Sequence, residues 1–413
     1  MEAEKSTKNV VVDREPFEVP GFVASAVAAS IRYRDRHDLA LIAAEADAET
    51  TASGVFTKNR FCAAPVELCK LHLESGSPRA VIVNAGIANA CTGEEGLARA
   101  REMAGLAARA LHIPTERVLV ASTGVIGRQV PIEPVRNAMA ALVQGLRPGG
   151  WEQAARAIMT TDTVPKMAVA RISLGGKTVT IGGIAKGSGM IAPDMATLLA
   201  FACTDATVHK DVLDHWVRLG AEESFNRITV DGDTSTNDTL LVFASGRAGN
   251  GVILDRESTE SRVFGQALKA VLLDLAKQLV MDGEGATKFI EIQVTSAACV
   301  GDARTIAFTV AHSPLVKTAF FGEDANWGRI VAAAGRAGVP LDPERVALYF
   351  DDVCVFRDGA PIHDPDIEAK ASSVFKRKEI AVRLDLRMGE SDFTAYTCDL
   401  SYDYVKINAS YRS

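Results

Sequence analysis

The chain has 413 residues, enough for two or three domains at roughly 150 residues each. Hydrophobic residues make up 47% of it and aromatic residues only 6%, which predicts a sizeable core of small and branched aliphatic side chains and excludes a disordered chain. The net charge of −7, from 45 basic and 52 acidic residues, excludes the basic excess typical of nucleic-acid-binding proteins.

The sequence pattern of the first half of the chain predicts strands and helices in mixed order. Short β-type runs are expected within residues 21–57, followed by a buried strand at 80–83 and a glycine- and asparagine-containing turn. Residues 94–112 carry apolar side chains at helical spacing, and a second strand and turn follow in RVLVASTGVIG. Further helices are expected near 132–146 and 152–159.

The second half predicts a similar mixture. Paired strands are expected at 167–173 and 178–185, around the turn Gly175-Gly176. Helices are expected at 212–226 and 261–281, and strands at 239–244, 288–295 and in the last third, in 347–356, 379–388 and 393–405. Because strands and helices do not alternate regularly, we expect a mixed, layered α/β fold and not a doubly wound Rossmann sheet.

Cysteines and histidines give no sign of a disulfide framework or a metal site. None of the seven cysteines has CxxC spacing, and the closest histidines, His209 and His215, are six residues apart. No run reaches the roughly 20 apolar residues of a membrane span. The charged start MEAEKSTKN is unlike a secretory signal, so we expect a soluble cytoplasmic protein.

The glycine-rich segment 187–192 formally matches the dinucleotide fingerprint G-x-G-x-x-A. That fingerprint must open a helix whose N-terminus receives a pyrophosphate. Here the segment continues into Ala192-Pro193-Asp194 and then the apolar strand TLLAFA. A nucleotide site is therefore not expected.

The same loop leads to Thr197 at the start of a strand that should be buried. A threonine hydroxyl is a weak nucleophile unless a base removes its proton, and one known base is the threonine's own α-amine after chain cleavage. An α-amino pKa of about 7.7–8.0 suits that work. The alternative is a threonine kept for its β-propensity, and the chemistry alone leaves both interpretations open.

The segment DGDTSTND, residues 231–238, resembles the start of a calcium loop. An EF-hand would need glycine at its sixth position and glutamate at its twelfth, where this chain has Thr236 and Val242. We therefore expect a polar turn before the strand TLLVFA.

KGSGMIAPDMATLLAF closely resembles the self-processing and nucleophile segment of the ornithine acetyltransferases, the bifunctional glutamate N-acetyltransferases of arginine biosynthesis. Seven further segments resemble blocks of that family in the family's order: NAGIANACTG, STGVIG, MTTDT, DGDTSTNDT, DGEGATKFIEI, GEDANWGRI and YVKINASYRS. Together they run from about Asn84 to Ser413, which is nearly the whole chain.

The resemblance implies an N-terminal-nucleophile-like architecture of the DmpA/ornithine acetyltransferase type. It implies self-cleavage between Ala196 and Thr197 into an α chain, 1–196, with the oxyanion-hole turn and the substrate lysine, and a β chain, 197–413, with the nucleophile and the sheet-rich C-terminal region. Thr197 matches the nucleophile, and Thr123 and Gly124 match the oxyanion-hole pair. The substrate-binding positions are matched by Thr160, Lys186, Thr197, Glu284, Asn408 and Ser413.

The implied reaction moves an acetyl group from N2-acetyl-L-ornithine to L-glutamate through an acetyl-Thr197 intermediate. Lys186 would meet a substrate carboxylate and Glu284 the free ammonium of ornithine. No bound cofactor, metal, nucleic acid or membrane is expected. The resemblance implies a heterotetramer of two α and two β chains, and it leaves open whether acetyl-CoA also serves as donor.

Two other functions remain open at this point. An N-terminal-nucleophile amidase or aminopeptidase would use the same processing chemistry with water as the acceptor. A non-catalytic small-molecule binding protein would have kept the fold without the chemistry.

Overall fold

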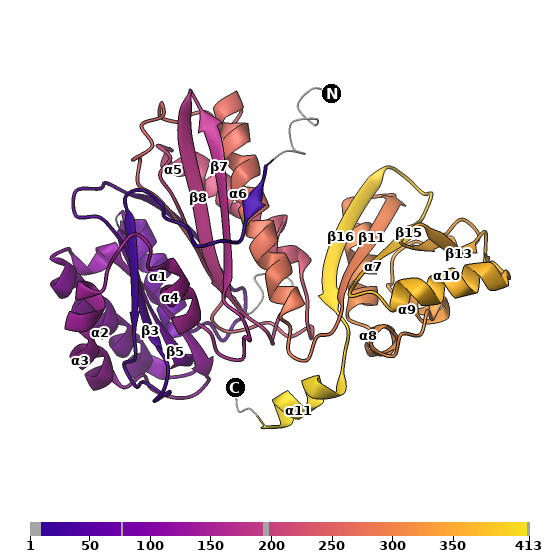
Figure 1. Ribbon diagram of the computed structural model, residues 1–413, viewed down its shortest axis with the longest axis horizontal. Coiled ribbons are helices and arrows are strands. Elements are labelled where there is room, and N and C mark those ends of the chain that lie inside the picture. Colours follow the sequence, from indigo (N-terminus) through magenta and orange to yellow (C-terminus); the bar gives the residue numbers. More distant parts are fainter. Residues whose placement is uncertain (1–9, 76, 193–197, 411–413) are drawn as a thin grey trace.

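The computed structural model describes residues 10–75, 77–192 and 198–410. Within that part, three β-sheets and their helices form two bodies, shown in Figure 1: two packed sheets with their helices on the left and in the centre, and the third sheet with its helices on the right. The structure confirms the expected mixed, layered α/β fold.

The first sheet is built from strands that lie far apart in the chain. Its order is β1-β7-β8-β9-β10-β4. β9 and β10 pair in parallel and the other neighbours pair antiparallel. The strands are β1 (Val12–Asp13), β4 (Thr51–Phe56), β7 (Lys166–Leu174), β8 (Lys177–Lys186), β9 (Leu199–Thr204) and β10 (Thr239–Ala244).

The second sheet comes from the N-terminal region, in the order β2-β3-β5-β6. Its strands are β2 (Phe22–Val27), β3 (Leu39–Ala44), β5 (Ala80–Ile87) and β6 (Val118–Val125), and β5 pairs with β6 in parallel. Side chains alternate between the faces of a strand. Along β3, Leu39 and Leu41 therefore enter the core under the helices, whereas Ala40 and Ile42 enter the core shared with the first sheet.

These cores define four layers, helices–sheet–sheet–helices. The outer face of the second sheet is covered by α2 (Gly93–Leu111) and α3 (Ile132–Gln144), with α1 (Ala64–Ser75) against β6. The outer face of the first sheet is covered by α5 (Lys210–Glu222) and α6 (Thr259–Met281). α4 (Trp151–Ala157) inserts Trp151 into the core between the two sheets. Short 3-10 turns lie at Thr115–Arg117 and Phe225–Arg227.

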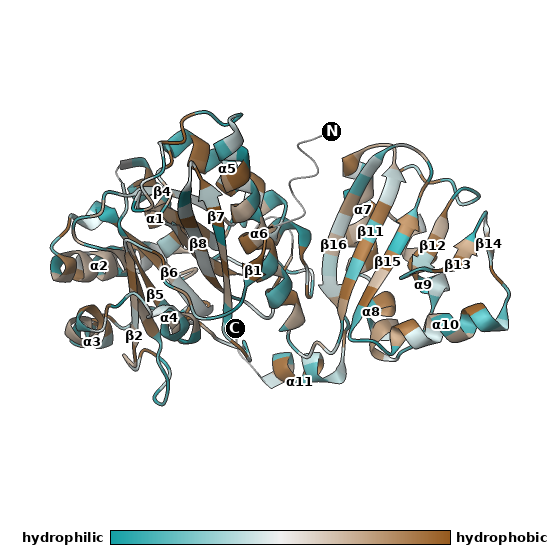
Figure 2. Ribbon diagram, turned by 45° about the horizontal axis from the view of Figure 1, so that its top comes forward, coloured by the Kyte–Doolittle hydropathy of each residue, from teal (hydrophilic) through white to brown (hydrophobic). Residues whose placement is uncertain are grey.

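The third sheet makes up the C-terminal body, in the order β14-β13-β12-β15-β11-β16. Figure 2 shows hydrophobic and hydrophilic bands alternating along β11 and β15, because helices cover one face of this sheet. The strands are β11 (Phe289–Ala297), β12 (Ala347–Phe350), β13 (Val353–Arg357), β14 (Ala360–Pro361), β15 (Glu379–Asp385) and β16 (Ser391–Cys398). The helices are α7 (Val300–Ala311), α8 (Pro314–Phe321), α9 (Trp327–Gly335) and α10 (Pro365–Phe375).

The strand expected over 393–405 is wrong beyond Cys398. β16 ends there, and a helix, α11 (Tyr402–Ser410), follows and leads the chain away from the third sheet toward the first body (Figure 1). Alternating aromatic and β-branched side chains favour a strand on a buried surface. Here Tyr402 and Val405 are exposed, so no such surface holds them in a sheet.

The predicted cleavage point falls between two neighbouring strands of the first sheet. Ala196 and Thr197 lie outside the described residues, but β8 before them and β9 after them pair antiparallel, with Lys186 opposite Leu199. An α chain and a β chain would therefore share this sheet. Among the described residues, no helix combines the length and the apolar character needed to cross a membrane.

Candidate active site

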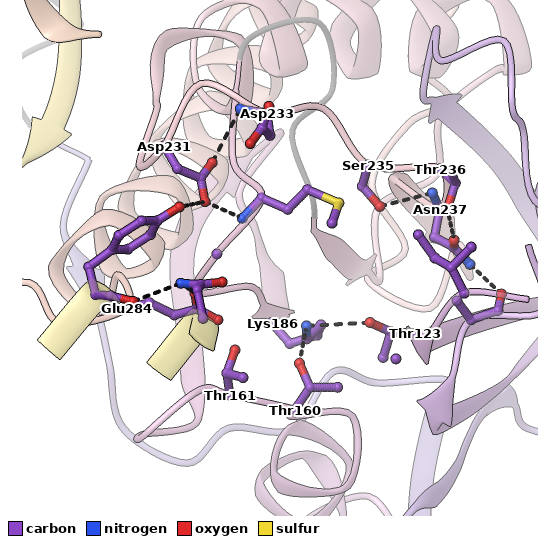
Figure 3. A pocket seen from close by; sticks show the side chains of 17 residues that line it. Thr123, Thr160, Thr161, Lys186, Asp231, Asp233, Ser235, Thr236, Asn237 and Glu284 are labelled. Carbon is purple, nitrogen blue, oxygen red and sulfur yellow. Dashed lines mark hydrogen bonds between the residues drawn. The ribbon is translucent and has the colours of Figure 1, made fainter. Parts of the chain in front are cut away.

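One pocket brings together segments that lie far apart in the chain, from Ala88 to Asn408 (Figure 3). It lies where β6 and β8 end and where the loops before β10 and β11 meet α11. Six residues predicted from the sequence line it: Thr123, Gly124, Thr160, Lys186, Glu284 and Asn408. The other lining residues are Ala88, Ile126, Thr161, Gly189, Met190, Asp231, Asp233, Ser235, Thr236, Asn237 and Tyr404.

Thr123 and Gly124 were expected in a turn after the strand, but they lie within β6, near its end, where β6 runs very close to β5. Gly124 pairs with Gly86 and has a φ of +130°, in the region that favours glycine. A Cβ atom at residue 124 would lie 2.2 Å from the carbonyl carbon of Gly86. Only glycine therefore fits here, and the close approach of the two strands brings this backbone to the pocket wall.

A buried amide fixes the strand end that carries this pair. The Nδ2 group of Asn237 donates to the carbonyl oxygen of Ser122, at 2.8 Å, and to that of Ala88, at 2.6 Å. Asn237 precedes β10 of the first sheet, so it ties the two sheets together beside Thr123. The residues 231–238 thus form a polar turn before β10, as expected, but one that also lines the pocket.

Lys186, the last residue of β8, places a buried ammonium group at the floor of the pocket. Its Nζ donates to Thr160 Oγ1 at 2.8 Å and to Thr123 Oγ1 at 3.4 Å, so that Lys186 lies between the two hydroxyls in Figure 3. Burial lowers the pKa of Lys186, and the carboxylate of Asp162 offsets part of that effect. The arrangement offers a cation and two hydroxyl groups to one bound group, which suits a carboxylate.

Glu284 places a carboxylate on another side of the same pocket. Its Oε2 accepts a hydrogen bond from Asn408 Nδ2 of α11 at 2.8 Å, which ties the C-terminal helix to the site. Glu284 packs directly over Gly189, where a Cβ atom would lie 2.4 Å from the carboxyl carbon. The pocket therefore carries opposite charges on different walls.

Asp231 and Tyr404 also line the pocket and were not predicted as site residues. The carboxylate of Asp231 accepts the backbone N–H groups of Met190, at 2.6 Å, and Ile191, at 2.9 Å. It also accepts the Tyr404 hydroxyl at 3.4 Å. Burial raises the pKa of Asp231, and the backbone hydrogen bonds offset part of that effect. The density of polar residues in DGDTSTND, greater than a turn needs, was the available signal.

The glycine-rich loop therefore has a role other than dinucleotide binding. Residues 187–192 form no helix, and Met190 and Ile191 are held by Asp231. Within the described part of the chain, no group of three or more histidine, cysteine, aspartate or glutamate side chains is arranged to hold a metal ion. All seven cysteines lie in that part and are free thiols.

Three predicted site residues, Ala196, Thr197 and Ser413, lie outside the described residues. Leu198, the first described residue after Thr197, is held at both backbone groups. Its N–H donates to Asp238 Oδ1 at 3.0 Å, and its carbonyl accepts the N–H of Thr239 at 3.1 Å. Burial raises the pKa of Asp238 well above the ordinary range.

Comparison with known proteins gives the family. A model of the ArgJ family matches residues 23–413. The chain belongs to the ArgJ family. It is 51% identical to the arginine biosynthesis bifunctional protein ArgJ of Symbiobacterium thermophilum over 395 residues, covering 95% of this chain and 97% of the relative. Its identity to the ArgJ of Geobacter sulfurreducens is 50% over 395 residues, covering 96% and 100%.

Solved structures include two similar proteins. A crystal structure of ArgJ from Bacillus halodurans shares 40% identity at a TM-score of 0.49, covering 51% of this chain and 98% of that one. The ornithine acetyltransferase of Mycobacterium tuberculosis, solved with ornithine, shares 36% identity at a TM-score of 0.41, covering 46% and 100%.

Membership of the ArgJ family confirms the resemblance recognised in the sequence blocks. The chain is an acetyl-transferring enzyme of arginine biosynthesis. The ArgJ match begins at residue 23 and so includes every predicted site residue, from Thr123 to Ser413.

Proposed function

We propose that this enzyme moves the acetyl group of N2-acetyl-L-ornithine to L-glutamate through an acetyl-Thr197 intermediate. The observation that carries the proposal is the charge pattern of the pocket. Lys186 offers an ammonium and Glu284 a carboxylate, and Thr123 and Gly124 of β6 line the same pocket. N2-acetyl-L-ornithine is complementary to that pattern, because its carboxylate suits Lys186 and its free side-chain ammonium suits Glu284.

In the first half-reaction the α-amine of Thr197 takes the proton of its own hydroxyl, and the oxygen attacks the acetyl carbonyl. The negative charge that develops on the carbonyl oxygen is stabilised by Thr123 and Gly124; losing one such donor costs roughly 2.7–4 kcal/mol of barrier. The C–N bond then breaks, and the proton passes to the amine of the departing ornithine. In the second half-reaction the amine of glutamate attacks the carbonyl carbon of acetyl-Thr197 and the ester C–O bond breaks. The proton that the glutamate amine loses passes through the α-amine of Thr197 to the oxygen and restores the hydroxyl.

The α-amine at Thr197 requires cleavage of the Ala196–Thr197 bond. The pairing of β8 with β9 supports this part of the proposal, because an α chain and a β chain that share a sheet stay together after the cut. Lys186 and Thr160 then belong to the α chain, and Glu284, Asn408 and Ser413 to the β chain. Both chains contribute to one substrate site.

Three further features belong to the proposal. No cofactor is bound, and acetyl-CoA serves as a second acetyl donor, in keeping with the word bifunctional in the relatives' name. The enzyme is a heterotetramer of two α and two β chains, which would cover exposed apolar side chains such as Tyr402 and Val405 of α11. It works in the cytoplasm.

The test compares the wild type with Thr197→Ala. We expect the variant to run as one chain on a denaturing gel and to transfer no acetyl group, because it lacks the attacking oxygen. A matched control, Thr305→Ala, changes an exposed threonine of α7 and should be cleaved and active like the wild type. A Thr197→Ala enzyme that still transfers acetyl groups would refute the mechanism.

The same assay separates the transferase from the amidase or aminopeptidase. Loss of N2-acetyl-L-ornithine by the wild type is measured with and without L-glutamate. A transferase consumes the donor at a sustained rate only when glutamate is present. A rate that does not depend on glutamate would favour the hydrolase.

A further inference from the structure

Beneath the pocket, four buried charged side chains form a network of ion pairs. Lys166 Nζ donates to Asp162 Oδ1 at 2.6 Å and to Asp282 Oδ2 at 2.5 Å, and the Lys186 ammonium lies 3.7 Å from Asp162 Oδ2. These four side chains are at most 7% exposed. Two positive and two negative charges balance one another, as buried charges require. Lys186 is the only one of the four among the residues that line the pocket.

The carboxylate of Asp162 interacts with three groups around Lys186. Its Oδ2 accepts the backbone N–H of Thr160 at 3.0 Å, and its Oδ1 accepts that of Gly187 at 2.7 Å. It therefore holds the backbone of Thr160 and of the residue that follows Lys186, and it faces the Lys186 ammonium. The Lys186–Thr160 hydrogen bond is thus fixed from both ends by one carboxylate.

Asp162 also acts on the charge of Lys186. Burial lowers the pKa of Lys186, Asp162 is the strongest group that raises it, Lys166 lowers it and Glu284 raises it. Asp238 is a further acidic group that interacts with Lys186 electrostatically. Burial acts against the charged form of Asp162 too, but Lys186 and Lys166 hold its pKa well below the usual range. Asp162 is therefore a fixed negative charge at any working pH.

At the other end of these four charges, Asp282 is linked by hydrogen bonds to the segment that carries Glu284. Asp282 accepts the hydroxyl and backbone N–H of Thr163, and its own carbonyl accepts the Ser188 hydroxyl at 2.6 Å. The Ser188 carbonyl in turn accepts the N–H of Glu284 at 2.8 Å. Lys166 thereby links the segment that carries Glu284 to the carboxylate that faces Lys186.

We propose that Asp162 is a positioning residue for substrate binding: it holds the Lys186 ammonium and the Thr160 hydroxyl in the geometry that receives the substrate carboxylate, and it keeps that ammonium charged. The inference rests on the proposed function, since it takes a substrate carboxylate as the partner of Lys186. Asp162 itself does not line the pocket and acts only through Lys186 and Thr160.

The test is the pH dependence of kcat/KM for N2-acetyl-L-ornithine in Asp162→Asn, a change of nearly the same size. Without the carboxylate the pKa of Lys186 falls, so the ammonium is lost at lower pH and the basic limb of the profile moves to lower pH. On the alkaline side KM should rise roughly tenfold or more, as expected for a weakened charged hydrogen bond, with kcat changed less.

A second variant, Lys166→Gln with Asp282→Asn, removes two charges from the same buried network but keeps Asp162. It removes the like charge that lowers the pKa of Lys186, so the basic limb should move to higher pH, opposite to Asp162→Asn. General loosening of the fold would not move the two limbs in opposite directions. If Asp162→Asn does not fold, the double variant decides alone, because without Lys166 the Asp162 carboxylate acts on Lys186 undivided. A shift to higher pH then supports the inference, and no shift overturns it.

An Asp162→Asn enzyme with an unchanged limb and KM would also overturn the inference. Failure of the proposed function is distinguishable, because the wild type would then transfer no acetyl group from N2-acetyl-L-ornithine. A wild type that is active, with variants that do not shift, refutes the role of Asp162 alone.

Discussion

Replacing Gly124 by alanine should damage both stability and catalysis, because a methyl group has no room at that position. The new Cβ would lie 2.2 Å from the carbonyl carbon of Gly86 and 2.4 Å from its oxygen, in backbone that cannot turn aside. Forcing extra atoms into a packed site costs about 1–3 kcal/mol. The φ of +130° adds strain of about 1–3 kcal/mol. We expect the free energy of unfolding to fall by about 2–6 kcal/mol.

Gly127→Ala is the matched control. Gly127 lies three residues further on, also has a positive φ, +76°, and has open space where a Cβ would be placed. It should therefore show only the strain of a left-handed residue, about 1–2 kcal/mol. Urea unfolding of both variants separates the clash from the strain.

The catalytic consequence is measured on the folded fraction of each variant. If β5 and β6 are pushed apart, Thr123 and Gly124 no longer meet the oxyanion, and kcat should fall by about 10²–10³. Gly127→Ala should keep a kcat near that of the wild type. Equal unfolding free energies and equal kcat values in the two variants would refute the reasoning.

Two further substitutions test the walls of the pocket. In Gly189→Ala the added Cβ would lie 2.4 Å from the Glu284 carboxyl carbon, so the Glu284 side chain must turn away. KM for N2-acetyl-L-ornithine should rise about tenfold, while the free energy of unfolding changes by less than about 1 kcal/mol. An unchanged KM would contradict the role of Glu284. In Asn237→Ala the buried carbonyls of Ala88 and Ser122 lose their hydrogen-bond donor. The free energy of unfolding, measured in urea, should therefore fall by about 2–5 kcal/mol. A loss below about 0.5 kcal/mol would show that water replaces the amide.

The sequence predicted the strands better than the way they assemble. β3, β5 and β6 follow from short apolar runs, and the helix at α2 follows from its periodicity. Local patterns do not say that β4 joins β10, nearly two hundred residues later, or that two sheets pack face to face. Those pairings depend on which apolar faces meet in three dimensions. The helix α11 was missed because its aromatic and β-branched residues favour a strand.

In the site, too, some residues follow from the sequence and others only from the folded structure. Lys186 and Glu284 were found because they lie within blocks that resemble family motifs, and the fold brings them to one pocket. Asp162 and Asp231 were not found. Their work is to accept backbone N–H groups and to balance buried charge, and it depends on partners that only the folded chain supplies. A polar residue in a turn looks the same in sequence whether or not it has such a partner.

The central claim, a covalent acetyl-threonine intermediate, is tested most directly by mass spectrometry of the enzyme mixed with N2-acetyl-L-ornithine in the absence of L-glutamate. The account predicts that the β chain gains the mass of one acetyl group, on the peptide that begins with Thr197. It also predicts that adding L-glutamate removes this group and yields N-acetylglutamate. An enzyme that transfers acetyl groups but never carries one on that peptide would contradict the account.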